Sequence, residues 1–286
     1  MGNRKNQSTT TVATREHRAA LPILDSRLPI PRNALTIAGS DSGGGAGIQA
    51  DLKTFHACGV HGLSAIAAIT SQNTRGVTAI HPVPLRHIRS QIAAVFDDFP
   101  IAAVKTGMLG NAASVRLVAR EMRARKPAWL VVDPVTIATS GARLLDEGAI
   151  AVLTNELVPL ADVLTPNLPE AEALLGYTIR SAKDCARAGA DLRALGAKAV
   201  LLKGGHGSGR EVVDRFFDAR GVLELRHPRL KLDAHGTGCT LASAVAAELA
   251  KGQSPRQAVR RAVAYVQRAL AHGYQPGSAP LRVLRH

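Results

Sequence analysis

Short apolar runs alternate with longer helix-forming segments from Asn33 onward, and this alternation constrains the fold more than any other feature of the chain. The runs are nearly continuous in apolar residues, as expected of strands that are covered on both faces. Strands that alternate with helices run parallel and are joined by right-handed crossovers. The predicted strands are Leu35–Ala38, Leu63–Ile69, Ala102–Thr106, Trp129–Asp133, Val163–Thr165 and Ala199–Leu202.

Helices are predicted between these strands, and several have marked ends. The last helix begins with Ser254 as N-cap, Pro255 in the first turn and Gln257 as capping-box partner, and Gly273 ends it. The other predicted helices are Gly47–Cys58, Leu85–Phe96, Asn111–Arg125 and Ala182–Leu195. Residues 211–233 predict an antiparallel hairpin that turns at Gly221. We therefore expect an α/β fold, a three-layer α/β/α sandwich whose mostly parallel central sheet has an antiparallel edge hairpin.

The first 32 residues differ from the rest of the chain in being polar, aperiodic and rich in proline toward their end. They contain no apolar core of the kind found in secretory signals, so we predict a disordered arm over residues 1–32 and a single domain over residues 33–286. No run of about 18 apolar residues lacks charge, so no membrane contact is expected. The three cysteines are far apart and form no C-x-x-C pair, which favours a reduced, cytoplasmic protein.

The formal net charge of +14 raises the possibility of nucleic-acid binding. The basic residues are nevertheless scattered over helix faces, and aromatic residues make up only 3% of the chain, too few to stack on bases. We interpret the basic residues as solvated helix faces; an anionic small ligand fits the charge as well as a polymer does, and we predict that nucleic acid is not a partner. A non-catalytic protein that binds a ligand or nucleic acid is the rival hypothesis from another functional class.

Polar or glycine-rich signatures follow six consecutive predicted strands, at the edge of a parallel sheet where ligands bind. In chain order these signatures are "GSDSGGGAG", "QNTRG", "KTGML", "DPV", "TPNLPE" and "KGGH". Glycines required only for turns would not also bring Asp41, Gln72, Asp133, Asn167 and Lys203 to one edge. This convergence predicts a ligand site at the carboxyl ends of the strands.

The stretch "HGTGCT" (235–240) places a glycine turn before an alanine-rich helix. Gly236 and Gly238 permit positive φ and close approach of a ligand, and the helix directs its unpaired amides at the turn. Together they predict an anion hole that suits a phosphoryl group. A thiol at this helix start, Cys239, should have a lowered pKa. The alternative is a small residue at the start of a helix after a tight turn.

Three other stretches carry weaker signals. The glycines at 43–47 fit neither a Walker A loop nor G-x-G-x-x-G, but they allow the chain to pack against a flat ligand. Asn167 and Glu170 share the start of a helix and suit hydrated Mg²⁺; an ordinary helix N-terminus with Pro169 in its first turn would explain Glu170 but not Asn167. Asp133 and Lys203 end strands, where they could hold a metal or its waters and offset phosphate charge.

In their order, these stretches resemble the bacterial hydroxymethylpyrimidine/phosphomethylpyrimidine kinase family of the ribokinase-like superfamily, over roughly residues 33–272. The resemblance implies ATP-dependent phosphorylation of 4-amino-5-hydroxymethyl-2-methylpyrimidine to its monophosphate and then to the pyrophosphate, in thiamine biosynthesis. It also implies Mg²⁺ as cofactor and a homodimer. The nearest alternative is a pyridoxal or pyridoxine kinase on the same fold, which Thr136 leaves open because the family usually has Met at that position.

The resemblance also implies roles for individual residues. Cys239 would orient or deprotonate the hydroxymethyl group, at the position where sugar kinases have an Asp base. The anion hole would comprise Gly236, Thr237 and Gly238, with Lys203 beside it. The pyrimidine pocket would comprise Gly39, Ala46, Asp51, Gln72, Met108 and Val135. The nucleotide side would comprise Asn167, Lys203 and Thr237, with Asp133 and Glu170 at the metal.

Overall fold

The computed structural model describes residues 31–136, 145, 147–205, 209–230 and 232–286. Of the predicted arm at 1–32, all but the last two residues lie outside this described part, as do residues 137–144 of the stretch after Asp133 and His206 of "KGGH". Residues Pro31–His286 form one compact unit.

A sheet of eight strands runs through this unit, in the order β10-β9-β8-β7-β6-β5-β1-β2. Six strands of this sheet, β1, β2, β5, β6, β7 and β8, pair in parallel. The strands β9 and β10 add an antiparallel hairpin at one edge. Their bounds are Asn33–Ala38 (β1), His61–Ile66 (β2), Ile101–Thr106 (β5), Leu130–Val132 (β6), Val163–Leu164 (β7), Val200–Leu202 (β8), Glu211–Asp218 (β9) and Gly221–Pro228 (β10). The predicted fold class is confirmed.

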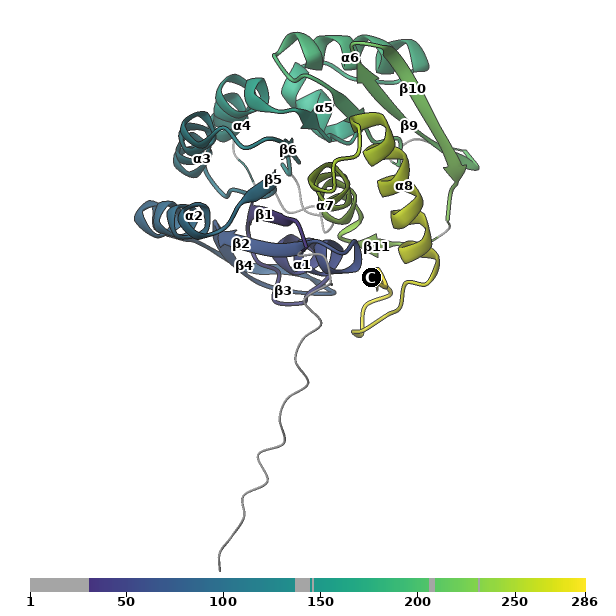
Figure 1. The fold of residues 1–286 in the computed structure, drawn as a ribbon. Coiled ribbons are helices and arrows are strands. Elements are labelled where there is room, and N and C mark those ends of the chain that lie inside the picture. Colours follow the sequence, from purple (N-terminus) through teal and green to yellow (C-terminus); the bar gives the residue numbers. More distant parts are fainter. Residues whose placement is uncertain (1–30, 137–144, 146, 206–208, 231) are drawn as a thin grey trace, which may run out of the picture. The chain divides into compact units, whose positions relative to one another are not determined.

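Helices cover both faces of the sheet (Figure 1). On one face lie α2 (Leu85–Asp98), α3 (Ala112–Arg125), α4 (Glu147–Val152), α5 (Leu168–Leu175) and α6 (Ala182–Ala194). On the other lie α1 (Gly47–Ala57), α7 (Thr237–Ala250) and α8 (Pro255–Ala271), with α7 between α1 and α8. Every residue of α7 from Thr240 to Ala250 is buried, and its many alanines allow the neighbouring elements to approach closely.

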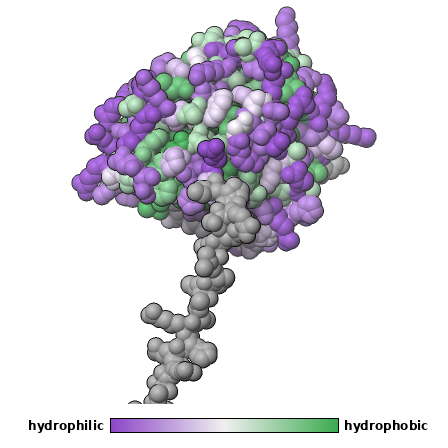
Figure 2. Space-filling model, viewed as in Figure 1, coloured by the Kyte–Doolittle hydropathy of each residue, from purple (hydrophilic) through white to green (hydrophobic). Residues whose placement is uncertain are grey.

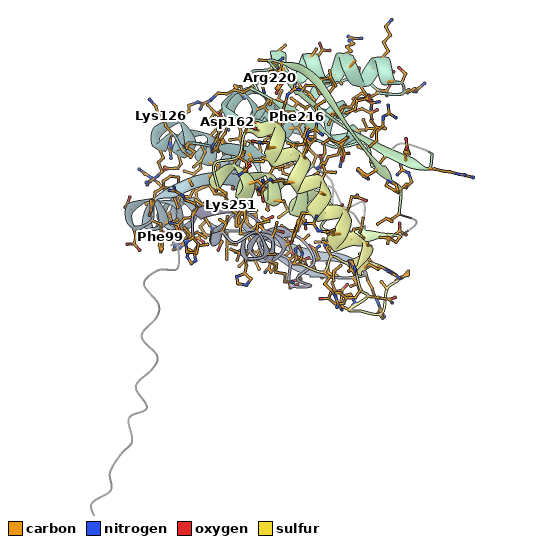
Figure 3. The ribbon with its side chains drawn as sticks, turned by 45° about the vertical axis from the view of Figure 1, so that its right-hand side comes forward. Phe99, Lys126, Asp162, Phe216, Arg220 and Lys251 are labelled. Atoms are coloured by element: carbon orange, nitrogen blue, oxygen red, sulfur yellow. The ribbon has the colours of Figure 1, made fainter. Side chains whose placement is uncertain are left out.

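Hydrophilic side chains cover most of the face seen in Figure 2, with smaller hydrophobic areas between them. Several basic residues lie in turns, including Lys126 after α3, Arg220 after β9 and Lys251 after α7, and all three are exposed (Figure 3). Such placement is typical of solvated charge at the ends of elements.

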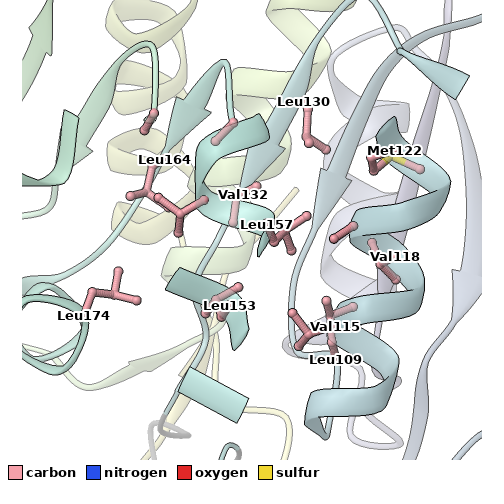
Figure 4. Close-up of a cluster of buried hydrophobic side chains, with 14 of the residues drawn as sticks. Leu109, Val115, Val118, Met122, Leu130, Val132, Leu153, Leu157, Leu164 and Leu174 are labelled. Atoms are coloured by element: carbon pink, nitrogen blue, oxygen red, sulfur yellow. The ribbon is translucent and has the colours of Figure 1, made fainter. Parts of the chain in front are cut away.

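Two hydrophobic cores lie on the two faces of the sheet, because strand residues alternate between the faces. In β6, Leu130 and Val132 belong to one core and Val131 to the other. Figure 4 shows part of the first core, with Val115 and Val118 on the side of α3 that faces the other buried residues. The near-continuous apolar runs of the sequence therefore correspond to strands that are covered on both faces.

The structure divides the predicted strand Leu63–Ile69. β2 ends at Ile66, and Ala68–Asn73 forms β3, which pairs with β4 (Gly76–Pro82) in a separate antiparallel hairpin. The amide of Ala67 still donates to the carbonyl of Ala38, so the chain leaves the large sheet directly after this residue. Because the apolar run continues across the break, its pattern could not locate the end of β2.

A second small sheet joins distant parts of the chain. β11 (Ala234–His235) pairs in parallel with β12 (Arg282–Val283), directly before the turn of "HGTGCT". At α8, the amide of Ser254 donates to Oε1 of Gln257 at 3.3 Å, as the predicted capping box requires. The helix ends at Ala271 with His272 as C-cap, one residue before the predicted Gly273.

Candidate active site

A cavity of about 760 Å³ opens at the carboxyl ends of the parallel strands, beside the N-terminus of α7. Its wall comes from the loops after β1, β5, β6, β7 and β8, from the hairpin strand β3 and from α7. The predicted site residues at this cavity are Gly39, Ala46, Gln72, Met108, Asp133, Val135, Asn167, Glu170, Lys203, Gly236, Thr237, Gly238 and Cys239. Segments spread over two hundred residues of sequence thus meet around one space.

Asp51 is the predicted pocket residue that the structure places elsewhere. Its side chain is fully buried beneath the cavity, where Nζ of Lys105 lies 2.9 Å from each carboxylate oxygen. Thr36 and Ser243 each donate a hydroxyl to it at 2.6 Å. The expectation that Asp51 lines the pyrimidine pocket is therefore corrected, because all of its strong acceptor positions are used by the protein itself.

Lys105 was not among the predicted site residues. It contributes to the wall of the cavity, although its side chain is fully buried. Burial alone would lower the pKa of the Lys105 ammonium, but the Asp51 carboxylate outweighs this effect and the pKa is raised. A lysine inside the otherwise apolar strand run "IAAVKT" was the available signal, since a buried cation requires a partner.

The turn before α7 has the geometry of an anion site. Gly236 has φ of 80°, and a Cβ there would overlap the carbonyl of Gly45, so only glycine fits. α7 then begins at Thr237, with its unpaired amides and positive dipole end at the cavity. A Cβ on Gly238 would lie 3.2 Å from Nζ of Lys203. Because Gly238 has no side chain, the Lys203 ammonium can lie close to the turn.

The predicted lowering of the Cys239 pKa is wrong. Burial raises the pKa of this thiol to about 11, and the carboxylates of Asp51 and Asp133 act in the same direction. The positive charge of Lys105 and the amide of Gly47 oppose the shift but do not reverse it. In the ligand-free protein Cys239 is therefore a neutral thiol at the cavity wall, suited to hydrogen bonding rather than to acting as a standing thiolate.

Lys203 sits between two buried carboxylates at the other end of the anion site. Its Nζ lies 3.0 Å from Oδ1 of Asp133 and 3.6 Å from Oε2 of Glu170. Burial raises the pKa of Glu170 to about 7; the charge of Lys203 opposes this shift and the charge of Asp133 adds to it. Two carboxylates thus share one ammonium and leave surplus negative charge beside the cavity.

The prediction that stability alone would not explain Asn167 is wrong, because this residue is the N-cap of α5. Its Oδ1 accepts from the amide of Glu170 at 2.8 Å, and the Glu170 carboxylate accepts from the amide of Asn167 at 2.8 Å. This capping box starts α5, with Pro169 in the first turn. Stability alone therefore accounts for an Asn at this position, while the second carboxylate oxygen of Glu170 stays outside the box.

The described residues contain no group of three or more His, Cys, Asp or Glu arranged to hold a metal ion. Asp133 and Glu170 nevertheless fit hydrated Mg²⁺, which binds through one or two carboxylates and fills its other positions with water and phosphate oxygens. Their surplus charge, expressed in the raised Glu170 pKa, is what a divalent cation would neutralise.

Asp41 and His235 organise the glycine-rich loop; the sequence placed Asp41 at the ligand-binding edge but gave neither residue a role in the site. Oδ1 of Asp41 accepts from the amide of Gly43, and Oδ2 accepts from the amides of Gly45 and Ala46. The signal for Asp41 was available, because an Asp before Ser-Gly-Gly is typical of an Asx turn. Nothing local indicates His235, whose Nε2 reaches Oδ2 of Asp41 from 194 residues away at 3.1 Å.

Apolar side chains also line the cavity, together with the polar Asp214, His227 and Gln267. Val212 of β9, Leu241 of α7 and three side chains of α8 line it, and the α8 residues are Val263, Val266 and Leu270. Residues at this spacing usually indicate only the buried face of a helix, so the sequence did not reveal their position. An apolar recess beside an anion site suits a flat aromatic base that is attached to phosphates.

None of the described helices combines the length and apolar character needed to cross a membrane. A family model described as phosphomethylpyrimidine kinase matches residues 41–283. The chain is 49% identical to the hydroxymethylpyrimidine/phosphomethylpyrimidine kinase of Haemophilus influenzae over 247 residues, which cover 84% of this chain and 91% of that protein. It is 47% identical to the thiamine biosynthesis bifunctional protein of Geobacter sulfurreducens over 87% of this chain, and it spans about half (51%) of that protein.

Two solved structures show the same fold. The phosphomethylpyrimidine kinase of Clostridium difficile has a TM-score of 0.76 and 43% identity, over 84% of this chain and 99% of that chain. The pyridoxal kinase of Bacillus subtilis in an ADP complex has a TM-score of 0.84 and 34% identity, over 90% of this chain and 98% of that chain.

Proposed function

The chain belongs to the phosphomethylpyrimidine kinase family, and on this premise we propose that it transfers the terminal phosphoryl group of ATP to 4-amino-5-hydroxymethyl-2-methylpyrimidine and then to the resulting monophosphate. The second transfer yields the pyrophosphate used in thiamine biosynthesis. The observation that carries this proposal is that a helix N-terminus, Lys203 and the amide of Gln72 face one cavity.

Phosphoryl transfer proceeds through a loose transition state whose charge lies on the equatorial oxygens, so positioning and charge neutralisation dominate catalysis. The amides at the start of α7 and the ammonium of Lys203 are fixed before the substrates arrive, which makes them effective in stabilising that charge. Gly236 and Gly238 allow the phosphoryl group to approach these amides without meeting a side chain.

Cys239 has a different role in the two steps. As a neutral thiol it orients the hydroxymethyl oxygen in the first step. The minor thiolate form, which the nearby Lys105 charge favours, would accept the hydroxyl proton as that oxygen attacks phosphorus, and would thereby return to the thiol. The acceptor in the second step is a phosphate that is already ionised, so no base is needed.

Asp133 and Glu170 would hold Mg²⁺, which neutralises phosphate charge when bound. The ammonium of Lys203 would then form fewer contacts with these two carboxylates and would contact the phosphate oxygens instead. ATP would place its base in the apolar recess beside α8 and its phosphates toward α7, with Asn167 and Thr237 beside them.

We also propose that residues 33–286 act as a single kinase domain, in the cytoplasm where ATP is available, and that the protein forms a homodimer. The hairpin β3–β4 supports the dimer, because it leaves Ile69 51% exposed and Ile80 38% exposed in a two-stranded sheet, a form that is marginally stable alone. Sedimentation equilibrium of the wild type, compared with an Ile69→Glu variant, tests this association.

Mass analysis of the products tests the function. Purified protein is mixed with Mg·ATP and the hydroxymethylpyrimidine, and in parallel with pyridoxal. We expect additions of one and then two phosphate groups to the pyrimidine and a slower single addition, or none, to pyridoxal. Faster turnover of pyridoxal would instead favour the vitamin B6 alcohols as substrates, and ATP-independent binding of DNA or RNA would favour a non-catalytic role.

A further inference from the structure

His235 and Gln72 meet at the cavity wall, and their contact determines which way round Gln72 presents its amide. Gln72 lies on β3, and His235 ends β11 directly before the glycine turn. Both line the cavity, and Nε2 of Gln72 lies 2.7 Å from Nε2 of His235. This is hydrogen-bonding distance, so one atom must donate and the other must accept.

Asp41 decides which His235 nitrogen carries the hydrogen. Its Oδ2 lies 3.1 Å from Nε2 of His235 and also accepts from two loop amides. Although burial raises the pKa of Asp41, the hydrogen bonds from His235 and the loop amides outweigh it and the pKa is lowered. An ionised carboxylate can only accept, so Nε2 of His235 carries a hydrogen and donates.

The sense of the Gln72 amide follows from its two neighbours. The one hydrogen on Nε2 of His235 is shared between Oδ2 of Asp41 and the Gln72 amide atom that faces it. That amide atom has to be the oxygen, because an amide N–H would meet another N–H, so the two amide atoms of Gln72 exchange places. The opposite amide atom lies 3.2 Å from Oγ1 of Thr70, whose single hydrogen is already donated to the carbonyl of Ser40 at 2.8 Å. Thr70 therefore accepts at this point, and the amide nitrogen is the atom that faces it. Both neighbours select the same orientation, with the amide oxygen toward His235 and the nitrogen toward Thr70.

Resting on the proposed function, we propose that His235 is a positioning residue that orients the pyrimidine ring through Gln72. The amide retains one oxygen lone pair on the His235 side and one N–H on the Thr70 side. An aminopyrimidine offers the complementary pair, an amino N–H at C4 and the acceptor N3, and side-chain amides bind such edges in a bidentate manner.

The orientation of the ring then places the reacting group. With the amide oxygen on the His235 side, the C4 amino group lies on that side too. The hydroxymethyl group is attached to the neighbouring carbon, C5, so it is directed toward the turn Gly236–Cys239 that follows His235 along the chain. With the amide reversed, the ring would turn over and carry the hydroxymethyl group away from the turn.

An analogue with an oxo group at C4 tests this directly, because it presents an acceptor at C4 and an N–H at N3, the reverse of the amino compound. The wild type should prefer the amino compound over the oxo compound by at least about 100-fold in kcat/KM, since the mismatch leaves polar groups unpaired. His235→Phe removes the donor and lets the amide rotate, so this ratio should fall at least about tenfold. His235→Gln keeps a donor near the position of Nε2 and should retain the ratio.

His56→Phe serves as the matched control, because His56 is an exposed residue of α1, and it should leave kcat/KM for both compounds unchanged. If His235→Phe lowers kcat/KM for both compounds equally, His235 only supports the loop and the inference is wrong. A wild type that phosphorylates both compounds equally well also refutes it. Absence of turnover with the amino compound refutes the proposed function itself, a distinguishable failure.

A crystal of the wild type soaked with the amino compound gives a second measurement that does not depend on how the variants fold. We expect the hydroxymethyl oxygen on the side of Gly236–Cys239 and the amino group toward His235. A ring bound with its amino group toward Thr70 would overturn the inference.

Discussion

The buried ion pair of Lys105 and Asp51 gives the most quantitative prediction. Both side chains are completely inaccessible, and the carboxylate accepts four hydrogen bonds, two from Lys105 and one each from Thr36 and Ser243. Substituting Lys105→Met preserves the length and packing of the side chain but leaves the carboxylate with two neutral donors and no positive charge.

Removing one partner of a buried pair costs about 3–5 kcal/mol in the free energy of unfolding. For a domain of this size, 1 kcal/mol corresponds to about 2–4 °C, so the melting temperature should fall by about 6–20 °C. The raised Lys105 pKa means that its stabilisation is fully present below the ordinary value of 10.5 and is lost only as pH rises through the higher folded value. The wild type should therefore keep this stabilisation from pH 7 to pH 10.

Calorimetry and urea unfolding measure the effect, with Lys183→Met on the exposed side of α6 as control. The double variant Lys105→Met with Asp51→Asn removes both charges while keeping a carbonyl acceptor, and it should recover at least about half of the loss. If the double variant is as unstable as the single one, or if Lys105→Met costs less than about 1 kcal/mol, the uncompensated carboxylate is not the cause.

Three further predictions concern the site. In a variant whose other two cysteines are serine, alkylation of Cys239 by iodoacetamide should accelerate about tenfold per pH unit from pH 7 to 9, because a pKa of about 11 leaves the thiol mostly protonated; a plateau near pH 8 would contradict this. Cys239→Ser should slow the first phosphorylation more than the second, as followed by product mass in single turnovers, and equal losses would argue against a role at the alcohol. The Glu170 pKa is raised to about 7, so the folded protein binds this proton more tightly and stability falls as pH rises from 4.5 toward 7. Glu170→Gln keeps the capping box and should flatten this decline in the melting temperature between pH 5 and 7; an unchanged slope would assign the decline to other groups.

The sequence predicted those features that are encoded locally. Each strand of the parallel sheet carries its own apolar run, and the start of α8 is marked by Ser254 and Gln257, so neither required knowledge of the rest of the chain. The hairpin β3–β4 was missed because its first strand continues the apolar run of β2 without a turn residue between them.

Side-chain partners across long distances could not be predicted in the same way. Asp51 follows the glycine-rich loop and so looked accessible, but its partners come from β1, β5 and α7. The helix start alone suggested a reactive thiol at Cys239, whereas burial and two nearby carboxylates determine its actual protonation. The pairing of Asp41 with His235 has no local signature at all.

The pairing of β11 with β12 has a consequence for how the protein acquires activity. Val283 packs against Gly45, where a Cβ would approach its side chain to 2.9 Å, and its strand holds the residue that precedes the phosphate-binding turn. The ribosome makes residues 282 and 283 after every other strand of the fold. A nascent chain that has already assembled its large sheet therefore still lacks the edge partner of this turn, and competence for catalysis should follow the assembly of that sheet, when these residues leave the exit tunnel.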